Sequence, residues 1–433
     1  MARKGRVQSG LKVAVIGGGS TYTPELIEGF IKRREQLHVS QICLMDVDSE
    51  RLKIVGGLAQ RMVRWAEAET EVVLTTQRSE ALKAADFVVA QLRVGGLDGR
   101  ARDEAIPLEF GIVGQETTGP GGFAMALRTI PVMLEIAREA RTLCPDGCLI
   151  NFTNPSGLIA EALTKHCDIQ VIGLCNAPIT LRNRIATLLS VEGERIRLDY
   201  FGLNHLSWIR AVYLDGRNVT DEVLRKIIEG EAADLPGYAF SRRLLKALGM
   251  IPSGYLQYYY HADEVLEKMR AADKRRAEIV MDIDRELLDL YQDVNLSQKP
   301  KVLEQRGGAW YSDAAVALID AIANDKAEVH IVNVPNRGAL KELPDDVVVE
   351  VPAMVNRSGA RPLPVEEVPP AVRGLMQAVK AYEQLTVEAA LTGSRDAALL
   401  ALVAHPLVPT VGIAEKLLDR VLEANRPYLP QFE

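Results

Sequence analysis

One cysteine and one histidine of this chain are candidate ligands for a metal ion. Cys175 ends an apolar run, and His205 lies in a later extended stretch. A thiolate and an imidazole on one cleft form half of a divalent-metal site and leave positions for substrate oxygens and water. Their separation in sequence is not diagnostic, because a strand-end cysteine is more often a small buried hydrophobe and a lone histidine a core residue. The residues alone leave both interpretations open.

A glycine run near the N-terminus has the composition of a phosphate-binding turn. Gly17 allows a tight turn, Gly19 lets the backbone approach a pyrophosphate, and Ser20 stands where a helix begins. Asp46 closes the next apolar run, where a carboxylate can bind ribose hydroxyls and repel a 2'-phosphate. Tyr22 replaces the third glycine of the usual pattern, so an ordinary strand–helix turn is the alternative. The pattern favours a dinucleotide, and NAD over NADP.

Several charged residues have the chemistry to recognise an anionic substrate. Glu116 lies in a glycine-rich segment, residues 111–122, which is either a mobile loop or a substrate-binding loop. Arg93, Arg100 and Arg276 are either solvated charges or a phosphate clamp, since a guanidinium can bind a phosphate through two hydrogen bonds. Composition does not choose between these interpretations.

A tyrosine cluster comprises Tyr255, Tyr258, Tyr259 and Tyr260. Such clusters most often serve packing, because tyrosine combines an apolar ring with a polar tip. A phenol beside a cation can instead have a lowered pKa and act as a base.

The elements that must position these residues alternate between apolar runs and amphipathic stretches. The expected strands span 11–16, 42–45, 71–75, 86–92, 148–152 and 170–174. This order predicts a doubly wound, Rossmann-like parallel sheet, in which ligands bind beyond the carboxyl ends of the strands. We expect an NAD-binding domain over 10–190 and an α+β domain for substrate, metal and oligomerisation over 191–433. The proline-containing segment 351–370 is expected to wrap the surface.

Composition limits the classes of partner. The 433 residues carry 51 basic and 58 acidic side chains, a formal net charge of -7 that offers no polycationic face for nucleic acid or anionic lipid. The five cysteines are few and odd in number, which favours a reducing compartment, the cytoplasm. The sequence contains no run of about 20 apolar residues, so no membrane span is expected. A small-molecule partner is favoured.

A series of short motifs resembles the NAD- and metal-dependent glycoside hydrolase family 4, and within it the 6-phospho-β-glucosidases. The motifs, in family order, are IGGGSTYTPE (16–25), RVGGL (93–97), GQETTG (114–119), NFTNP (151–155), GLCN (173–176), GLNH (202–205) and YLQYYY (255–260). A set of ordered motifs is far more specific than any one of them. The resemblance extends to about residue 310, and the remainder is similar in general pattern.

The resemblance implies a role for each candidate residue. It implies that Cys175 and His205 bind a divalent cation, usually Mn²⁺, beside NAD. Asn176 stands where the α-specific phosphoglucosidases carry an aspartate as candidate acid, which favours the β-anomer. Tyr255 is the expected base, with Tyr258 and Tyr259 as weaker candidates.

Substrate contacts are implied in the same way. Asn154 matches a substrate-binding asparagine, and Arg276 resembles the phosphate-binding arginine, with Arg93 and Arg100 as weaker candidates. The implied substrate is therefore a phosphorylated sugar, and members of the family are usually homodimers or homotetramers.

The implied reaction is hydrolysis of 6-phospho-β-glucosides to glucose 6-phosphate and an aglycone. It proceeds by NAD-mediated oxidation at C3, deprotonation at C2, elimination, water addition and re-reduction, an exception to the two-carboxylate glycosidases. Alternatives are another family 4 activity (6-phospho-α-glucosidase, α-galactosidase or α-glucuronidase), an NAD-dependent 2-hydroxyacid dehydrogenase, or a noncatalytic NAD-sensing protein. The dehydrogenase acid–base motif is absent, because no histidine of the chain is followed by glycine.

Overall fold

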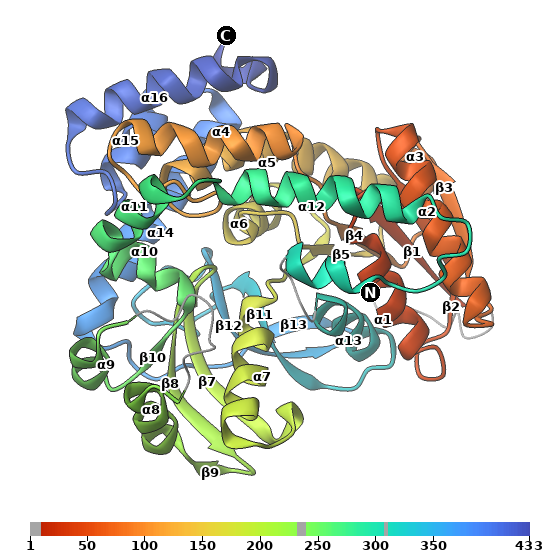
Figure 1. The fold of residues 1–433 in the computed structure, drawn as a ribbon, viewed down its shortest axis with the longest axis horizontal. Coiled ribbons are helices and arrows are strands. Elements are labelled where there is room, and N and C mark those ends of the chain that lie inside the picture. The colour runs from red at the N-terminus through yellow and green to blue at the C-terminus, as the bar shows by residue number, and fades with distance from the viewer. Residues whose placement is uncertain (1–9, 232–239, 307–310) are drawn as a thin grey trace.

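A nine-stranded sheet forms the centre of the molecule, as the computed structural model describes it for residues 10–231, 240–306 and 311–433 (Figure 1). The strand order is β13-β12-β11-β6-β5-β4-β1-β2-β3. The strands are β1 (Leu11–Ile16), β2 (Val39–Met45), β3 (Glu71–Thr75), β4 (Phe87–Ala90), β5 (Cys148–Asn151), β6 (Gln170–Gly173), β11 (Glu328–Pro335), β12 (Val348–Asn356) and β13 (Gly359–Pro362).

The six strands expected from the sequence are all present and pair in parallel. β4 and β5 are buried at every residue, as continuous apolar strands are when helices cover both faces of a parallel sheet. The Rossmann-like fold class is therefore confirmed. Because these strands run the same way, their carboxyl ends place Gly17, Asp46, Asn154 and Cys175 along one edge of the sheet.

Three further strands extend this sheet beyond β6. β11 pairs antiparallel with β6 and β12, and β12 pairs antiparallel with β13. The expectation that 351–370 wraps the surface is wrong for its first part, since β12 continues through Pro352 and β13 ends at Pro362. A division into domains near residue 190 stays a prediction, and strands from beyond that point hydrogen-bond into the N-terminal sheet.

A second, antiparallel sheet is built around one long hairpin. Its strands are β7 (Ile196–Leu203), β8 (Leu206–Leu214), β9 (Arg217–Asn218) and β10 (Ile251–Pro252). β7 and β8 pair directly, and the turn between them consists of Asn204 and His205. β7 also packs against β12, which brings this turn to the edge of the central sheet.

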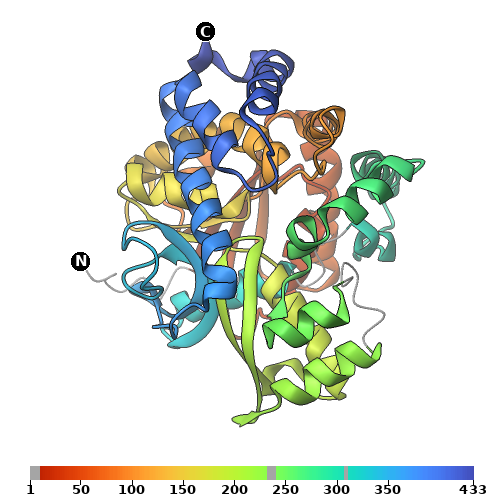
Figure 2. The same cartoon turned by 90° about the vertical axis from the view of Figure 1, so that its left-hand side faces the viewer.

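Helices cover the sheets. The long α14 packs against α5 and α6 beside the central sheet and against β7 of the second sheet. In Figure 2, α14 extends from the cyan strands to α15 and α16 at the C-terminal end. The helices are α1 (Thr23–Lys32), α2 (Ser49–Trp65), α3 (Arg78–Leu82), α4 (Gly96–Glu109), α5 (Gly119–Leu143), α6 (Ser156–His166), α7 (Ala177–Leu189), α8 (Thr220–Glu229), α9 (Arg242–Leu248), α10 (Gln257–Tyr260), α11 (Ala262–Ala271), α12 (Arg276–Tyr291), α13 (Tyr311–Ala323), α14 (Pro370–Thr392), α15 (Arg395–Ala404) and α16 (Val411–Asn425). Within the described ranges, no helix has the length and apolarity needed to cross a bilayer.

Candidate active site

The glycine run forms a tight turn between β1 and α1. Gly17 has a φ of +92°, and a Cβ there would lie 2.9 Å from the carbonyl oxygen of Gln91, so the position requires glycine. Asp46, directly after β2, accepts a hydrogen bond from the Gly19 backbone N–H at 2.8 Å. Ser20 Oγ accepts from the Tyr22 backbone N–H at 3.3 Å. The four cofactor-binding candidates thus lie together at the carboxyl ends of β1 and β2.

The two metal-ligand candidates meet although they come from different sheets. Cys175 follows β6, His205 lies in the β7–β8 turn, and Cys175 Sγ is 3.5 Å from His205 Nε2. Two donors bound to one cation at about 2.0–2.3 Å lie about 3–3.6 Å apart, so this spacing fits a shared cation. The described residues contain no group of three or more His, Cys, Asp or Glu side chains suited to a metal. A cation here would have two protein ligands and open positions.

The conformation of the hairpin turn directs His205 into the site. His205 has a φ of +62°, a left-handed conformation that is uncommon outside glycine but adopted by histidine more often than by bulky apolar residues. Asn204 holds the turn by donating from Nδ2 to Glu350 Oε1 at 3.0 Å and accepting from the Gly157 N–H at 3.3 Å. A left-handed backbone at a residue other than glycine is strained. It persists where the surrounding contacts fix the backbone, and such residues are concentrated at functional sites.

Burial leaves both metal-ligand candidates uncharged. It raises the pKa of the Cys175 thiol to about 12, with the Glu350 carboxylate adding to the effect. Burial lowers the pKa of His205 to about 4, with Glu116 opposing the shift. The neutral imidazole is the form that binds metals, and a coordinated thiol is deprotonated by the ion's charge. A cation could therefore bind the imidazole directly, whereas the thiol would have to lose its proton on binding.

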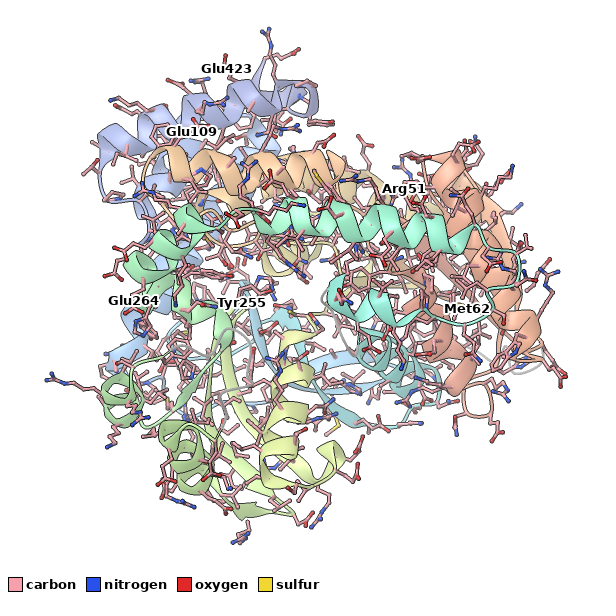
Figure 3. All side chains as sticks on the ribbon, viewed as in Figure 1. Arg51, Met62, Glu109, Tyr255, Glu264 and Glu423 are labelled. Carbon is pink, nitrogen blue, oxygen red and sulfur yellow. The ribbon has the colours of Figure 1, made fainter. Side chains whose placement is uncertain are left out.

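Tyr255, the expected base, lies against the metal-ligand pair. It is in a 3₁₀ turn (Gly254–Leu256) between β10 and α10 and is labelled in Figure 3. Its ring stacks on His205 with centroids 3.9 Å apart and planes 12° apart. Burial raises the pKa of Tyr255 well above its usual value, Cys175 adds to the shift, and Arg100 opposes it. Tyr258 packs edge-on against Tyr255 at 6.1 Å.

Three of the predicted substrate-binding residues form one half-buried charge cluster. Glu116 is 2.6 Å from Arg93 Nη1 and 3.0 Å from Arg100 Nη1. The two guanidinium groups hold the pKa of Glu116 below its usual value despite burial. Arg100 Nε also contacts Glu104 at 2.8 Å, so two carboxylates balance two arginines. These ion pairs join the segment around Glu116 to Arg93 and to α4.

Arg276 begins α12 beside this cluster. Glu104 accepts a hydrogen bond from the Ala277 backbone N–H at 2.8 Å, which links the start of α12 to Arg100. Arg276 is exposed, and its Nη2 donates to the Gln305 and Arg306 carbonyl oxygens at 3.0 and 2.9 Å.

One basic residue of this neighbourhood was missed by sequence reasoning. Arg306 lies over the Tyr22 ring, 4.5 Å from its centroid, and 3.6 Å from Asp284. Asp284 also pairs with Arg51 at 2.8 Å, and Arg51 Nε donates to the Gly19 carbonyl at 3.3 Å. No motif marks Arg306, because its neighbours come from distant parts of the chain.

The two candidate asparagines follow the neighbouring strands β5 and β6. Asn176 directly follows Cys175 and is the residue before α7, where its side chain makes no capping hydrogen bond. Asn154 precedes Pro155 across a cis peptide bond, directly before α6. Pro155, the residue after Asn154, lines the same small pocket as His205.

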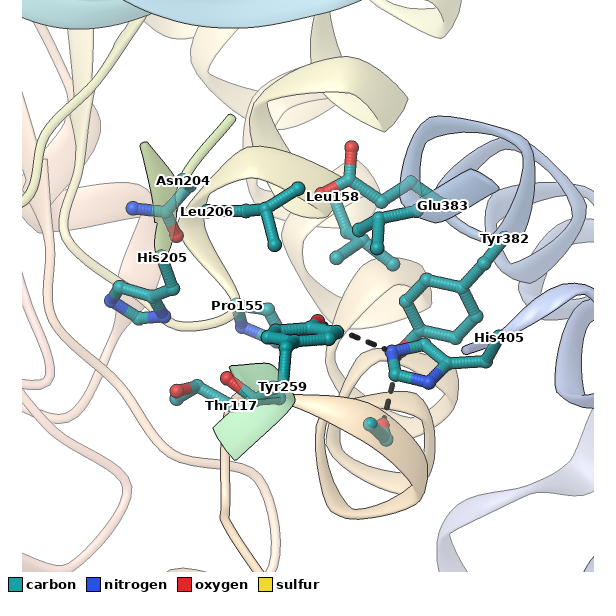
Figure 4. Close-up of a pocket in the computed structure, with 13 residues that line it drawn as sticks. Thr117, Pro155, Leu158, Asn204, His205, Leu206, Tyr259, Tyr382, Glu383 and His405 are labelled. Atoms are coloured by element: carbon teal, nitrogen blue, oxygen red, sulfur yellow. Dashed lines mark hydrogen bonds between the residues drawn. The ribbon is translucent and has the colours of Figure 1, made fainter. Parts of the chain in front are cut away.

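That pocket extends behind His205 (Figure 4). It is lined by Thr117, Thr118, Gly119, Pro155, Leu158, Asn204, His205, Leu206, Tyr259, Val379, Tyr382, Glu383 and His405. Glu383 and His405 were also missed by sequence reasoning, since nothing in their local sequence distinguishes them from core residues of a helical region.

Models of a known family match both halves of the chain. The model for family 4 glycosyl hydrolase matches residues 12–191, and the model for the family 4 glycosyl hydrolase C-terminal domain matches residues 200–408. The chain belongs to glycosyl hydrolase family 4.

Two relatives within the family are similar to the chain over nearly its full length. It is 46% identical to a probable 6-phospho-beta-glucosidase of Bacillus subtilis, with 98% of each chain covered. It is 42% identical to a 6-phospho-beta-glucosidase of Escherichia coli, with 98% of this chain and 97% of that protein covered.

Solved structures share the fold over nearly the full length. The 6-phospho-beta glucosidase of Thermotoga maritima, solved with manganese, NAD⁺ and glucose-6-phosphate, has a TM-score of 0.89 at 38% identity, covering 96% of this chain and 99% of that one. A malate dehydrogenase of Plasmodium falciparum, at 15% identity and a TM-score of 0.54 over 88% of this chain and 98% of that one, shares the fold alone.

Proposed function

We propose that this protein is an NAD- and divalent-metal-dependent 6-phospho-β-glucosidase that releases glucose 6-phosphate and an aglycone. The observation that carries the proposal is the convergence of Cys175, His205 and Tyr255, three residues from separate elements, next to the Arg93–Glu116–Arg100 cluster. The names of the relatives and the ligands of the Thermotoga maritima structure support it.

The residues of the site fit a divalent cation and NAD. Cys175 and His205 have a spacing that suits one cation, with Mn²⁺ the proposed metal. Gly17, Gly19, Ser20 and Asp46 would hold NAD at the turn after β1. When bound, NAD and the cation supply reversible oxidation at C3 and electrophilic stabilisation of negative charge at the neighbouring oxygens.

We assign the following roles to side chains of this protein. Tyr255 would accept the proton from C2 as its phenolate, the form that the positive charge of a bound cation would favour against the effect of burial on its pKa, because the ring lies directly against His205. Asn154 and Asn176, which follow the neighbouring strands β5 and β6, hydrogen-bond the sugar. Asn176 cannot act as a carboxylic acid, which supports the β-anomer. Arg276, with Arg93 and Arg100, binds the 6-phosphate. Glu116 keeps the latter two guanidinium groups in place.

The decisive experiment measures hydrolysis of a chromogenic 6-phospho-β-glucoside in D2O with NAD, Mn²⁺ and a thiol present. We expect turnover, and deuterium at C2 of the released sugar phosphate. Activity that survives thorough removal of both NAD and metal, or a product without label at C2, would refute the proposal. Net NADH accumulation with a 2-hydroxyacid would favour the dehydrogenase alternative, and the α-linked phosphoglucoside serves as the anomer control.

Asp46 should determine the affinity for NAD. Replacing it with alanine removes a charged acceptor from the Gly19 N–H and the group that repels a 2'-phosphate. Hydrogen bonds to charged groups contribute about 1.5–3 kcal/mol, so NAD should bind about ten- to a hundredfold more weakly and the preference over NADP should shrink. Fluorescence titration of both nucleotides measures this, with the exposed Glu50→Ala on α2 as control. An unchanged preference would contradict the assignment.

Arg276 should determine the affinity for the phosphate. In Arg276→Ala, we expect KM for the phosphorylated substrate to rise about tenfold or more while kcat falls less, because a charge-assisted contact is lost. The neighbouring Arg275→Ala is the matched control, since Arg275 is engaged with Glu278 at 3.0 Å. Steady-state kinetics and inhibition by inorganic phosphate test the assignment. Equal effects of the two substitutions would reject it.

Compartment and assembly are also proposals. We propose that the enzyme works in the cytoplasm, which is supported by the small and odd number of cysteines, and that it forms a homodimer or homotetramer. Light scattering of the purified chain measures the assembly.

A further inference from the structure

The pocket behind His205 contains buried polar atoms that lack partners. Thr118 and His205 are each 5% exposed, and among the described residues neither Thr118 Oγ1 nor His205 Nδ1 has a hydrogen-bond partner. Both residues line the pocket, together with the buried carboxylate of Glu383. An unpaired buried polar group is destabilising, so two of them in one pocket call for an occupant that bonds to them.

The hydroxyl of Tyr259 supplies a hydrogen-bond donor to the same pocket. His405 Nδ1 accepts from the Leu407 backbone N–H at 3.1 Å, so in a neutral imidazole the proton is on Nε2. Nε2 is 3.4 Å from the Tyr259 hydroxyl oxygen, which therefore accepts from His405. Burial lowers the pKa of His405 to about 3 and keeps it neutral. The hydroxyl proton of Tyr259 remains available for donation within the pocket that Tyr259 lines (Figure 4).

We propose that this pocket binds ordered water that accepts the hydrogen bond from His205 Nδ1–H and is anchored by Tyr259 and Thr118. A buried water needs two to four polar partners, and the pocket provides them. Histidines that bind a metal through one nitrogen almost always donate from the other to a carboxylate, a carbonyl or water. Since Nε2 faces Cys175, Nδ1 is the nitrogen that needs an acceptor. Tyr259 and Thr118 are thus positioning residues for His205, and Tyr259 is not the base.

The inference rests on the proposed metal role of His205, but its test separates the two. The test measures Mn²⁺ affinity by electron paramagnetic resonance for the full-length parent and for Thr118→Val and Tyr259→Phe. We expect about tenfold weaker Mn²⁺ binding in each variant, because loss of outer-shell partners lowers metal affinity by about 10–100-fold. Tyr260→Phe is the matched control; its hydroxyl accepts from Trp208 Nε1 at 3.3 Å, and it should bind Mn²⁺ like the parent.

Thermal unfolding adds a readout that does not need the metal. In a dry pocket, Thr118→Val removes an unpaired buried hydroxyl and should raise Tm. In a hydrated pocket, it removes a water partner and should lower Tm. A higher Tm with unchanged Mn²⁺ affinity would overturn the inference.

A crystal structure of the parent decides directly whether water is present. Density for ordered water within hydrogen-bonding distance of His205 Nδ1 and Tyr259 is expected, and an empty pocket would refute the inference even if a variant does not fold. Should the parent bind no Mn²⁺ while the water is visible, the proposed metal site fails and the hydrated pocket stands.

Discussion

His205→Ala will abolish manganese-dependent turnover while the chain keeps its fold. The imidazole is one of only two protein donors that we assign to the cation within the described residues, so its removal leaves the Cys175 thiol alone. We expect Mn²⁺ affinity to fall at least about a hundredfold and kcat at least about a thousandfold, since the cation contributes several kcal/mol and each factor of ten corresponds to about 1.4 kcal/mol.

The measurement combines metal content by mass spectrometry, steady-state kinetics and Tm. The exposed His166→Ala at the end of α6 is the matched control, because it removes the same ring far from the site. Cys175→Ser should reproduce the loss of metal with little change in volume. Retention of both metal and activity in either ligand variant would show that the pair serves packing only.

Tyr255→Phe will lower kcat by about 10²–10⁴-fold with little change in Mn²⁺ or NAD affinity. The substitution removes the phenol oxygen that we assign as the base and keeps the aromatic ring stacked 3.9 Å from His205. General base catalysis typically contributes a factor of this size. Exchange of the C2 hydrogen with D2O should slow in parallel.

Two further variants separate chemistry from packing at this position. Tyr255→Ala removes the stacked ring as well, so it should weaken Mn²⁺ binding in addition to kcat. Tyr260→Phe, in the same cluster but bonded to Trp208, should retain the parent kcat. A Tyr255→Phe enzyme with kcat within about threefold of the parent would transfer the role of base to another group.

Local patterns made the N-terminal half predictable. The parallel strands are continuous apolar runs, and Gly17, Asp46, Asn154 and Cys175 follow them directly, so a strand pattern is enough to place them along one edge. Residue types made His205 and Tyr255 candidates, but only the resemblance to family 4 assigned them roles, because no rule of spacing connects them to Cys175.

Contacts between distant segments were not predictable in the same way. Arg306 meets Tyr22, and His405 meets Tyr259, across long stretches of chain that carry no matching motif. Prolines argued against strands in 351–370, because proline lacks the N–H that a ladder uses. Pairing of β12 with β11 and β13 outweighed that local preference.

The attachment of β11 to β6 has a consequence for how the chain can be divided. A fragment ending near residue 190 would leave β6 as an open edge, and an unpaired strand edge recruits other chains. Such a fragment should self-associate or precipitate. Supplying residues beyond 190 as a separate polypeptide should restore a monodisperse particle, because β11 would again cap the exposed ladder.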